Sequence, residues 1–85
     1  MFIKGFVYIL HSLKDNKKYI GSTINLKNRL IKHNSGEVRS TKFRRPLVLK
    51  YILEYDSIKI ASFMEKKFKK SHDILVRELK KRKLL

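Results

Sequence analysis

Phe6-Val7-Tyr8-Ile9-Leu10-His11 and Lys18-Tyr19-Ile20-Gly21-Ser22 are the two segments from which the architecture of this chain is best read. Both are rich in aromatic and β-branched residues, which favour β-strands. Residues 12–17 (Ser-Leu-Lys-Asp-Asn-Lys) link them with side chains that are typical of turns. The sequence therefore predicts a β-hairpin at the start of the chain.

A helix is predicted after the hairpin, over Leu26–His33. Asn25 is suited to cap its first turn, because an asparagine side chain can accept a hydrogen bond from a free backbone N–H there. Leu26 and Leu30 are four residues apart, so they share one face of this helix. Gly36 is suited to end it in a left-handed conformation.

The second half of the chain alternates between irregular and periodic segments. Residues 37–45 lack periodicity and are predicted to form a loop, and Leu47–Tyr55 is predicted to form a strand that follows Pro46. Asp56 and Ser57 can cap a helix that runs to about Lys70. A last amphipathic helix is expected from about Asp73, with Ile74 or Leu75, Val76 and Leu79 facing inward.

The predicted order of elements is therefore β-β-α-β-α-α. This order indicates an α/β (α+β) fold in which a small three-stranded antiparallel sheet is flanked by helices. A chain of 85 residues can enclose one hydrophobic core, so residues 1–85 are expected to form a single domain. The hydrophobic fraction of 42% is sufficient for a packed interior.

The N-terminal segment Met1–Leu10 is apolar, but it does not have the pattern of a signal peptide. It lacks a basic leader, and no small-residue cleavage site follows it. We interpret it as a strand. No apolar run approaches the roughly 20 residues that span a bilayer. A cytoplasmic protein is expected, with no membrane partner.

The charge of the chain indicates its class of partner. The sequence has 22 Lys and Arg residues against 7 Asp and Glu, a net charge of +15. A charge of this density favours a polyanion, with nucleic acid ahead of an anionic membrane surface or an acidic protein. Ribosomal proteins share this composition, so charge alone does not indicate an activity.

Several kinds of chemistry are excluded by the residues present. There is no cysteine, so the chain has no disulfide and no thiolate metal site. His11, His33 and His72 do not have the spacing of a zinc site. The seven acidic residues do not pair as the carboxylates of a glycosidase do. The side chains that remain are those suited to phosphate chemistry.

Two pairs of residues are candidates for such chemistry. Arg29 and His33 lie four residues apart on the predicted helix and point the same way, where an arginine can hold a phosphate with both arms of its guanidinium. An ordinary solvated helix face is the alternative. Tyr8 and Tyr19 lie on adjacent predicted strands, where side chains meet across the pair. Simple core packing is the alternative for the tyrosines.

Glu65 is the candidate metal ligand. Its helical neighbours Ala61 and Phe68 place it at the edge of the buried face, among several lysines. A carboxylate that is partly out of water needs either a cationic side chain or a metal ion as its partner. Both alternatives are open on the sequence alone. Mg²⁺ often takes only one or two protein carboxylates, so one glutamate would be sufficient.

Taken in order, these residues give the chain a resemblance to the GIY-YIG nuclease superfamily. The paired motif is matched by Phe6-Val7-Tyr8 and by Tyr19-Ile20-Gly21, with Tyr19 eleven residues after Tyr8. The remaining matches follow in the family's order across the chain: Arg29, His33, Asn34, Gly36, Ser40, Thr41, Pro46, Ala61 and Glu65. The chain resembles the small single-domain members most closely.

The resemblance implies a role for each matched residue. Tyr8 would be the general base toward the attacking water, and Tyr19 would contact the phosphate or support the nucleophile. Arg29 would stabilise the charged transition state, and Glu65 would bind one Mg²⁺ or Mn²⁺ ion. Lys18 and His33 match residues that assist in part of the family, the lysine by lowering the pKa of the tyrosine.

Two departures from the family pattern are visible. Phe6 and Val7 stand where the first motif has Gly and Ile, and no asparagine follows Asn34 where some relatives have one near the C-terminus. We also expect no additional domain of the kind on which larger relatives rely. These differences bear on the choice of substrate more than on the fold.

The sequence therefore predicts a metal-dependent endonuclease that hydrolyses DNA, with RNA as a second possible substrate. Basic residues outside the catalytic set would hold the flanking backbone, although solvation alone also explains them. They are Arg39, Lys42, Arg44, Arg45, Lys66, Lys67, Lys69 and Lys70. One alternative is a non-catalytic nucleic-acid-binding module with the same fold, and another is a basic ribosome-associated protein. The oligomeric state is not indicated.

Overall fold

A computed structural model describes residues 3–85 of the chain. Met1 and Phe2, which were included in the predicted N-terminal strand, lie outside the described residues. The elements follow the order β1 (Gly5–Ser12), β2 (Lys18–Thr23), α1 (Leu26–Ser35), η1 (Lys42–Arg44), β3 (Leu47–Tyr55), α2 (Ile58–Lys70) and α3 (His72–Lys81). The predicted β-β-α-β-α-α order is confirmed.

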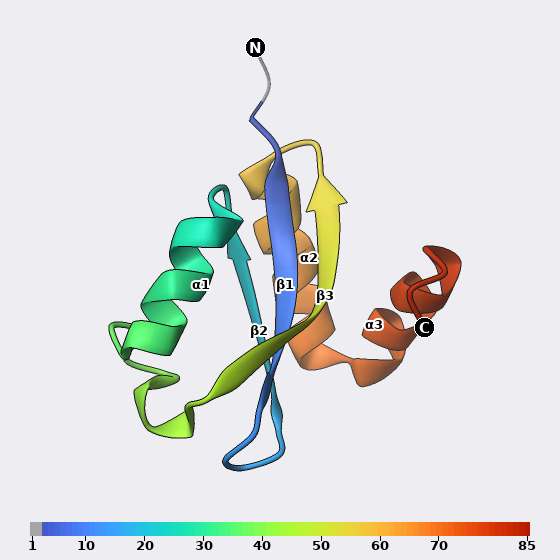
Figure 1. Ribbon diagram of the computed structural model, residues 1–85. Coiled ribbons are helices and arrows are strands. Elements are labelled where there is room, and N and C mark those ends of the chain that lie inside the picture. The colour runs from blue at the N-terminus through green and yellow to red at the C-terminus, as the bar shows by residue number, and fades with distance from the viewer. Residues whose placement is uncertain (1–2) are drawn as a thin grey trace.

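The three strands form one antiparallel sheet in the order β2-β1-β3, with the first strand at its centre (Figure 1). Tyr8 of β1 pairs with Gly21 of β2 on one side and with Ile52 of β3 on the other. The register between β1 and β3 shifts at Ile9 and Leu10. A three-stranded antiparallel sheet flanked by helices is the predicted architecture.

Both faces of the sheet are packed, because successive strand residues point to opposite sides. Val7 and Ile9 of β1 face α2 and α3, where they pack with buried residues that include Phe68 and Leu75. Tyr8 and Leu10 face α1 and contact Leu26 and Leu30, and Leu47 of β3 completes this smaller cluster. Figure 1 shows α1 on one side of the sheet and α2 behind it. The hydrophobic core is therefore divided into two layers.

The ends of the helices are determined by local side chains. Asn25 caps α1 by accepting a hydrogen bond from the Asn28 backbone N–H at 3.1 Å, and Gly36 ends it with φ of 85°. Ser57 caps α2 through the Ile60 N–H at 3.2 Å. Helix α3 begins at His72, one residue before the predicted start, and Ser71 caps it. Leu75 and Leu79 of α3 are buried, as predicted, and Val76 is half-buried.

The segment predicted as a loop over residues 37–45 contains a short 3₁₀ turn, η1. Two backbone hydrogen bonds of the i to i+3 type tighten it, from Thr41 N–H to Val38 C=O and from Arg44 N–H to Thr41 C=O. The loop prediction missed this turn because the segment has no helical periodicity. No helix within residues 3–85 has the length and apolar character needed to cross a membrane.

Candidate active site

The centre of the candidate site is the phenol of Tyr8, whose side chain has 0% of its surface exposed. Its oxygen lies 2.8 Å from Nε2 of His33 and accepts a hydrogen bond from Nε of Arg29 at 3.3 Å. Arg29 and His33 are one turn apart on α1, which packs over this face of β1 through Leu26 and Leu30. The structure thus brings Tyr8 together with two residues of α1 that are distant from it in the sequence.

Tyr19 lies beside this cluster on β2. Its ring centroid is 6.4 Å from that of Tyr8 and 5.0 Å from that of His33, in an edge-on arrangement with the histidine. Its hydroxyl accepts a hydrogen bond from Ser40 at 3.4 Å, and the side chain is half-buried. Tyr19 is therefore closer to solvent than Tyr8 and forms part of the cover over the cluster.

Gly21 of β2 explains how the Tyr8 ring fits into the sheet. A Cβ atom built on this glycine would overlap the hydroxyl and the outer ring carbon of Tyr8. The phenol therefore lies against bare backbone on the neighbouring strand. Any larger residue at this position would displace it from Arg29 and His33.

His33 is neutral in this environment. Burial, together with the positive charge of Arg29, lowers its pKa to about 4. A neutral imidazole has one nitrogen that donates a hydrogen bond and one that accepts. Its Nδ1 lies 2.7 Å from the hydroxyl oxygen of the buried Thr41, opposite the contact with Tyr8.

The hydrogen-bond network assigns the tautomer of His33. Arg29 donates to the Tyr8 oxygen, so the Tyr8 hydroxyl proton needs an acceptor of its own. Among the residues that the structure describes, Nε2 of His33 is the acceptor within reach. Nδ1 then carries the imidazole proton and donates a hydrogen bond to the hydroxyl oxygen of Thr41. The result is a continuous chain of hydrogen bonds from Tyr8 through His33 to Thr41.

The pKa of Tyr8 is raised above its ordinary value, because burial disfavours the charged phenolate. The hydrogen bond from Arg29 and the charge of its guanidinium act in the opposite direction but do not cancel the effect of burial. Tyr8 is therefore a neutral phenol at neutral pH in this structure. Its activation as a base requires a group that takes its proton, and Nε2 of His33 is in contact with it.

Thr41 matches a position of the family pattern, but its role as the acceptor of the His33 hydrogen bond was not predicted from the sequence. Thr41→Val has nearly the same shape and leaves the Nδ1–H of His33 without an acceptor. We expect unfolding in urea to show a loss of about 1–3 kcal/mol, the cost of one unsatisfied buried polar group. Nitrogen chemical shifts should also show His33 losing its single tautomer. Thr41→Ser, the control, should retain both properties, and an unchanged Thr41→Val protein would contradict the assignment.

Glu65 on α2 lies at the edge of the sheet beside β2. One of its oxygens accepts a hydrogen bond from the hydroxyl of Ser22, and the other is 2.6 Å from the ammonium of Lys69. Ser22 is in turn 3.2 Å from the hydroxyl of Ser62. The Glu65 side chain is 17% exposed, as expected for the rim of a buried face. Of the two alternatives left open for this carboxylate, the cationic partner is present as Lys69.

The donors around Glu65 fit a hard divalent ion. A carboxylate and two hydroxyls are oxygen ligands of the kind that Mg²⁺ and Mn²⁺ prefer. Residues 3–85 contain no group of three or more His, Asp and Glu side chains that could enclose a metal. An ion at this position would therefore be held by Glu65 with these two hydroxyls, and it would take its remaining ligands from water and from substrate.

Lys18 is not brought to the Tyr8 cluster. It lies on the face of the sheet opposite Tyr19, and its ammonium is 2.6 Å from Nδ1 of His72 at the start of α3. The alternation of side chains along β2 accounts for this position, because adjacent strand residues point to opposite sides. Its location gives no support to a role in lowering the pKa of Tyr8.

The residues predicted to hold nucleic acid fall into two groups. Arg44 and Lys69 are already paired within the protein: Arg44 binds Asp15 at 2.6 Å and the carbonyls of Lys17 and Lys18, and it holds the pKa of Asp15 well below its usual range. The others are exposed and form no ion pair among residues 3–85, namely Arg39, Lys42, Arg45, Lys66, Lys67 and Lys70. Only this unpaired group is available to a partner as it stands.

The sequence of the chain matches a known family of domains. The model for the GIY-YIG catalytic domain matches residues 4–75. A UPF0213 protein of Pediococcus pentosaceus is 41% identical over 68 residues, which cover 79% of this chain and 72% of that protein. A UPF0213 protein of Streptococcus pyogenes serotype M3 is 38% identical over 68 residues, which cover 79% of this chain and 73% of that protein.

A solved structure resembles this fold as well. The solution NMR structure of a UPF0213 protein from Bacillus halodurans matches with a TM-score of 0.53 and 30% identity, covering 94% of this chain and 85% of that one. The three-stranded sheet and the family match agree with one another. The chain belongs to the GIY-YIG family of nuclease-type catalytic domains.

Proposed function

We propose that this chain is an endonuclease that hydrolyses a phosphodiester bond in DNA with one Mg²⁺ or Mn²⁺ ion. The observation that carries the proposal is the contact of the Tyr8 oxygen with both Arg29 and His33. A phenol in contact with a neutral imidazole can pass its proton to that ring, and the imidazolium that forms balances the charge of the phenolate. A packing role alone would not require either contact.

Arg29 has two positions in this mechanism. In the free protein its guanidinium donates a long hydrogen bond of 3.3 Å to the Tyr8 oxygen, and the residue is half-buried. When DNA binds, the guanidinium moves to the scissile phosphate, which it holds with both arms. Its departure uncovers the Tyr8 oxygen, which is otherwise inaccessible to water. Substrate binding therefore exposes the base.

Proton transfer follows the chain of hydrogen bonds. The water that attacks phosphorus gives its proton to the Tyr8 oxygen, while the Tyr8 hydroxyl proton passes to Nε2 of His33. Arg29 lowers the pKa of His33 by its charge, so its movement to the phosphate makes the imidazole a better acceptor. Thr41 accepts the hydrogen bond from Nδ1 throughout and keeps the ring in position.

Glu65, with the hydroxyls of Ser22 and Ser62, would hold the divalent ion. When bound, the ion supplies a positive charge that polarises the scissile phosphate and neutralises the leaving oxygen. Lys69 releases the carboxylate and becomes available to the phosphate backbone. The net charge of +15 supports a nucleic acid as the substrate, and RNA is included in the test.

A non-catalytic nucleic-acid-binding module is the second candidate function. The complete burial of Tyr8 and its raised pKa favour this alternative, because a base must reach water to act. The module would keep the basic surface and use the tyrosine cluster only as a structural centre. The two candidates differ in one measurable property, which is cleavage.

The deciding experiment incubates the purified protein with duplex, flap, branched and single-stranded DNA, and with single-stranded RNA. We expect cleavage of at least one substrate with Mg²⁺ or Mn²⁺ and none with EDTA. Tyr8→Phe should lower the rate by about 100-fold or more, the scale of losing a general base. Tyr51→Phe is the matched control, since its hydroxyl lies outside the site. Binding of all substrates without any cleavage would establish the module instead.

A further inference from the structure

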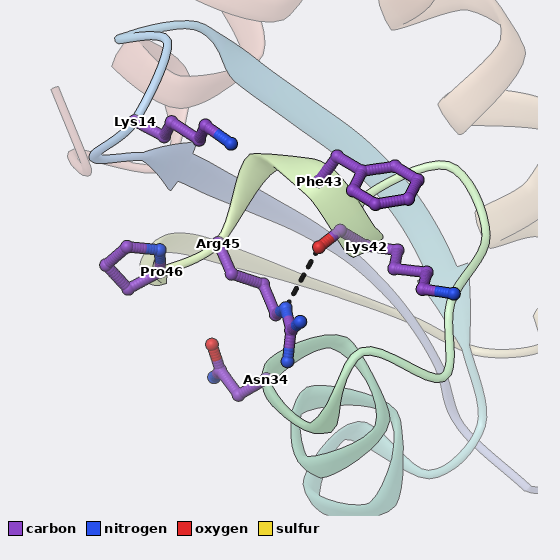
Figure 2. A pocket seen from close by; sticks show the side chains of 6 residues that line it. All are labelled: Lys14, Asn34, Lys42, Phe43, Arg45 and Pro46. Atoms are coloured by element: carbon purple, nitrogen blue, oxygen red, sulfur yellow. Dashed lines mark hydrogen bonds between the residues drawn. The ribbon is translucent and has the colours of Figure 1, made fainter.

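A second basic region of the molecule lies beside the candidate active site. It is a pocket of about 400 Å³ between the β1–β2 turn, the end of α1 and η1 (Figure 2). Its walls are formed by Lys14, Asn34, Lys42, Phe43, Arg45 and Pro46. None of these is acidic, and the nearby carboxylate of Asp15 forms an ion pair with Arg44. The pocket therefore carries an unbalanced positive charge.

Arg45 has no ion-pair partner among residues 3–85, whereas the adjacent Arg44 is paired with Asp15. Its Nε donates a hydrogen bond to the Lys42 carbonyl at 2.9 Å. The guanidinium packs against Gly36, where an added Cβ would come within 2.8 Å of Cζ and Nη1. Its two terminal nitrogens donate no hydrogen bond to any atom of residues 3–85. They form a fork that fits the oxygens of a phosphate.

Two further side chains extend this site. Figure 2 shows Lys14 reaching from the β1–β2 turn toward the space beside Arg45, with Asn34 below the guanidinium. Phe43 projects from η1 at the rim, and 74% of its surface is exposed. The ammonium of Lys42 lies 5.4 Å from the centre of its ring. An exposed aromatic ring beside cations is the usual platform for an unpaired base.

The pocket and the Tyr8 cluster share two segments of chain. Asn34 follows His33, and Lys42 follows Thr41, and His33 and Thr41 are joined by the 2.7 Å hydrogen bond. Neighbouring Cα atoms are about 3.8 Å apart, so the pocket begins one residue from the site on both walls. This adjacency is the ground for placing the continuation of a strand whose phosphate lies on Arg29 in this pocket.

We propose that this pocket binds an unpaired nucleotide of the strand that is cut. The phosphate lies between Lys14 and Arg45, and a base stacks on Phe43. The proposal rests on the proposed function for the identity of the strand, but nucleotide binding here requires no cleavage. It assigns the protein a preference for substrates with a single-stranded segment next to the cut.

Fluorescence tests the stacking contact directly, because the chain has no tryptophan. Phe43→Trp places one at the rim, and we expect a single-stranded oligonucleotide to quench its emission by half or more at saturation. The same oligonucleotide with abasic positions should quench it much less. Phe63→Trp is the matched control, since Phe63 is also exposed and has a lysine over its ring, but lies on α2. Equal quenching of both variants, or none at position 43, would overturn the proposal.

Binding measurements without metal test the phosphate contact. Arg45→Gln should weaken the affinity for single-stranded DNA by about tenfold, the scale of losing a charge-assisted contact, and should leave blunt duplex affinity within about twofold. Arg77→Gln on α3 removes the same charge elsewhere and should affect both ligands slightly and equally. If Arg45→Gln and Arg77→Gln lost the same affinity for single-stranded DNA, the pocket would act only as part of the general basic surface, and the proposal would be wrong. If the protein gave both expected results but cleaved no DNA, the proposed nucleotide pocket would stand and the proposed nuclease function would be wrong.

Discussion

Arg29→Ala is expected to lower the rate of single-turnover cleavage by about 100-fold to 1000-fold, the range for losing one donor that stabilises transition-state charge. Ground-state affinity for DNA should change little, because many exposed lysines and arginines remain. In the free protein, where Arg29 touches the Tyr8 oxygen, the same substitution also removes the positive charge that opposes the raised pKa of the phenol.

Arg29→Lys is the sharper variant. It retains the charge but cannot offer two parallel N–H groups to a phosphate, and we expect it to be nearly as inactive as Arg29→Ala. Lys66→Ala is the control, since Lys66 is exposed on α2 and is predicted only to hold the backbone. It should weaken binding, lower the salt dependence of affinity and leave the saturated rate near normal. If Arg29→Ala recovered its full rate at saturating protein, Arg29 would be an anchor only.

Glu65→Gln should abolish metal-dependent cleavage, with a loss of at least about 1000-fold, because the ion contributes several kcal/mol to the transition state. Glutamine keeps the shape of the side chain and can still accept the hydrogen bond from Ser22, so the fold should be preserved. Binding of Mn²⁺, followed by electron paramagnetic resonance, should be lost as well. DNA affinity should be unchanged or higher, since Lys69 no longer has a carboxylate partner.

Glu78→Gln provides a matched control for this variant. Glu78 also pairs with a cation four residues later on its helix, Arg82, at 2.9 Å, and it is similarly shielded. Both substitutions remove one negative charge and one ion pair, but only the change at position 65 touches the proposed metal ligands. Equal activities for the two variants would mean that Glu65 serves only its ion pair with Lys69.

Much of the fold could be predicted from local features of the sequence. The third strand, Leu47–Tyr55, has the predicted bounds, and Asn25 and Gly36 begin and end α1 as expected. These features depend on residues close together in the chain. The i, i+4 spacing likewise placed Arg29 and His33 on the same face, and the packing of Leu26 and Leu30 turns that face toward Tyr8.

The parts that could not be predicted depend on contacts between distant segments. Arg44 and Arg45 are adjacent and chemically identical, but Asp15 from the hairpin turn neutralises one and leaves the other free. Thr41 gains its role only because η1 brings it to His33. The position of Lys18 is different, since strand alternation already indicates that it faces away from Tyr19.

The fit of the Tyr8 phenol against Gly21 has a consequence for how the two short motifs should be interpreted. The two residues occupy one shared volume, so the side chain at either position limits what the other position can contain. They therefore behave as one interlocking unit, although thirteen positions separate them along the chain. Val7 faces the opposite layer of the core and takes no part in this unit. A chain can thus depart from the motif at Val7 and still retain the geometry that Tyr8 requires.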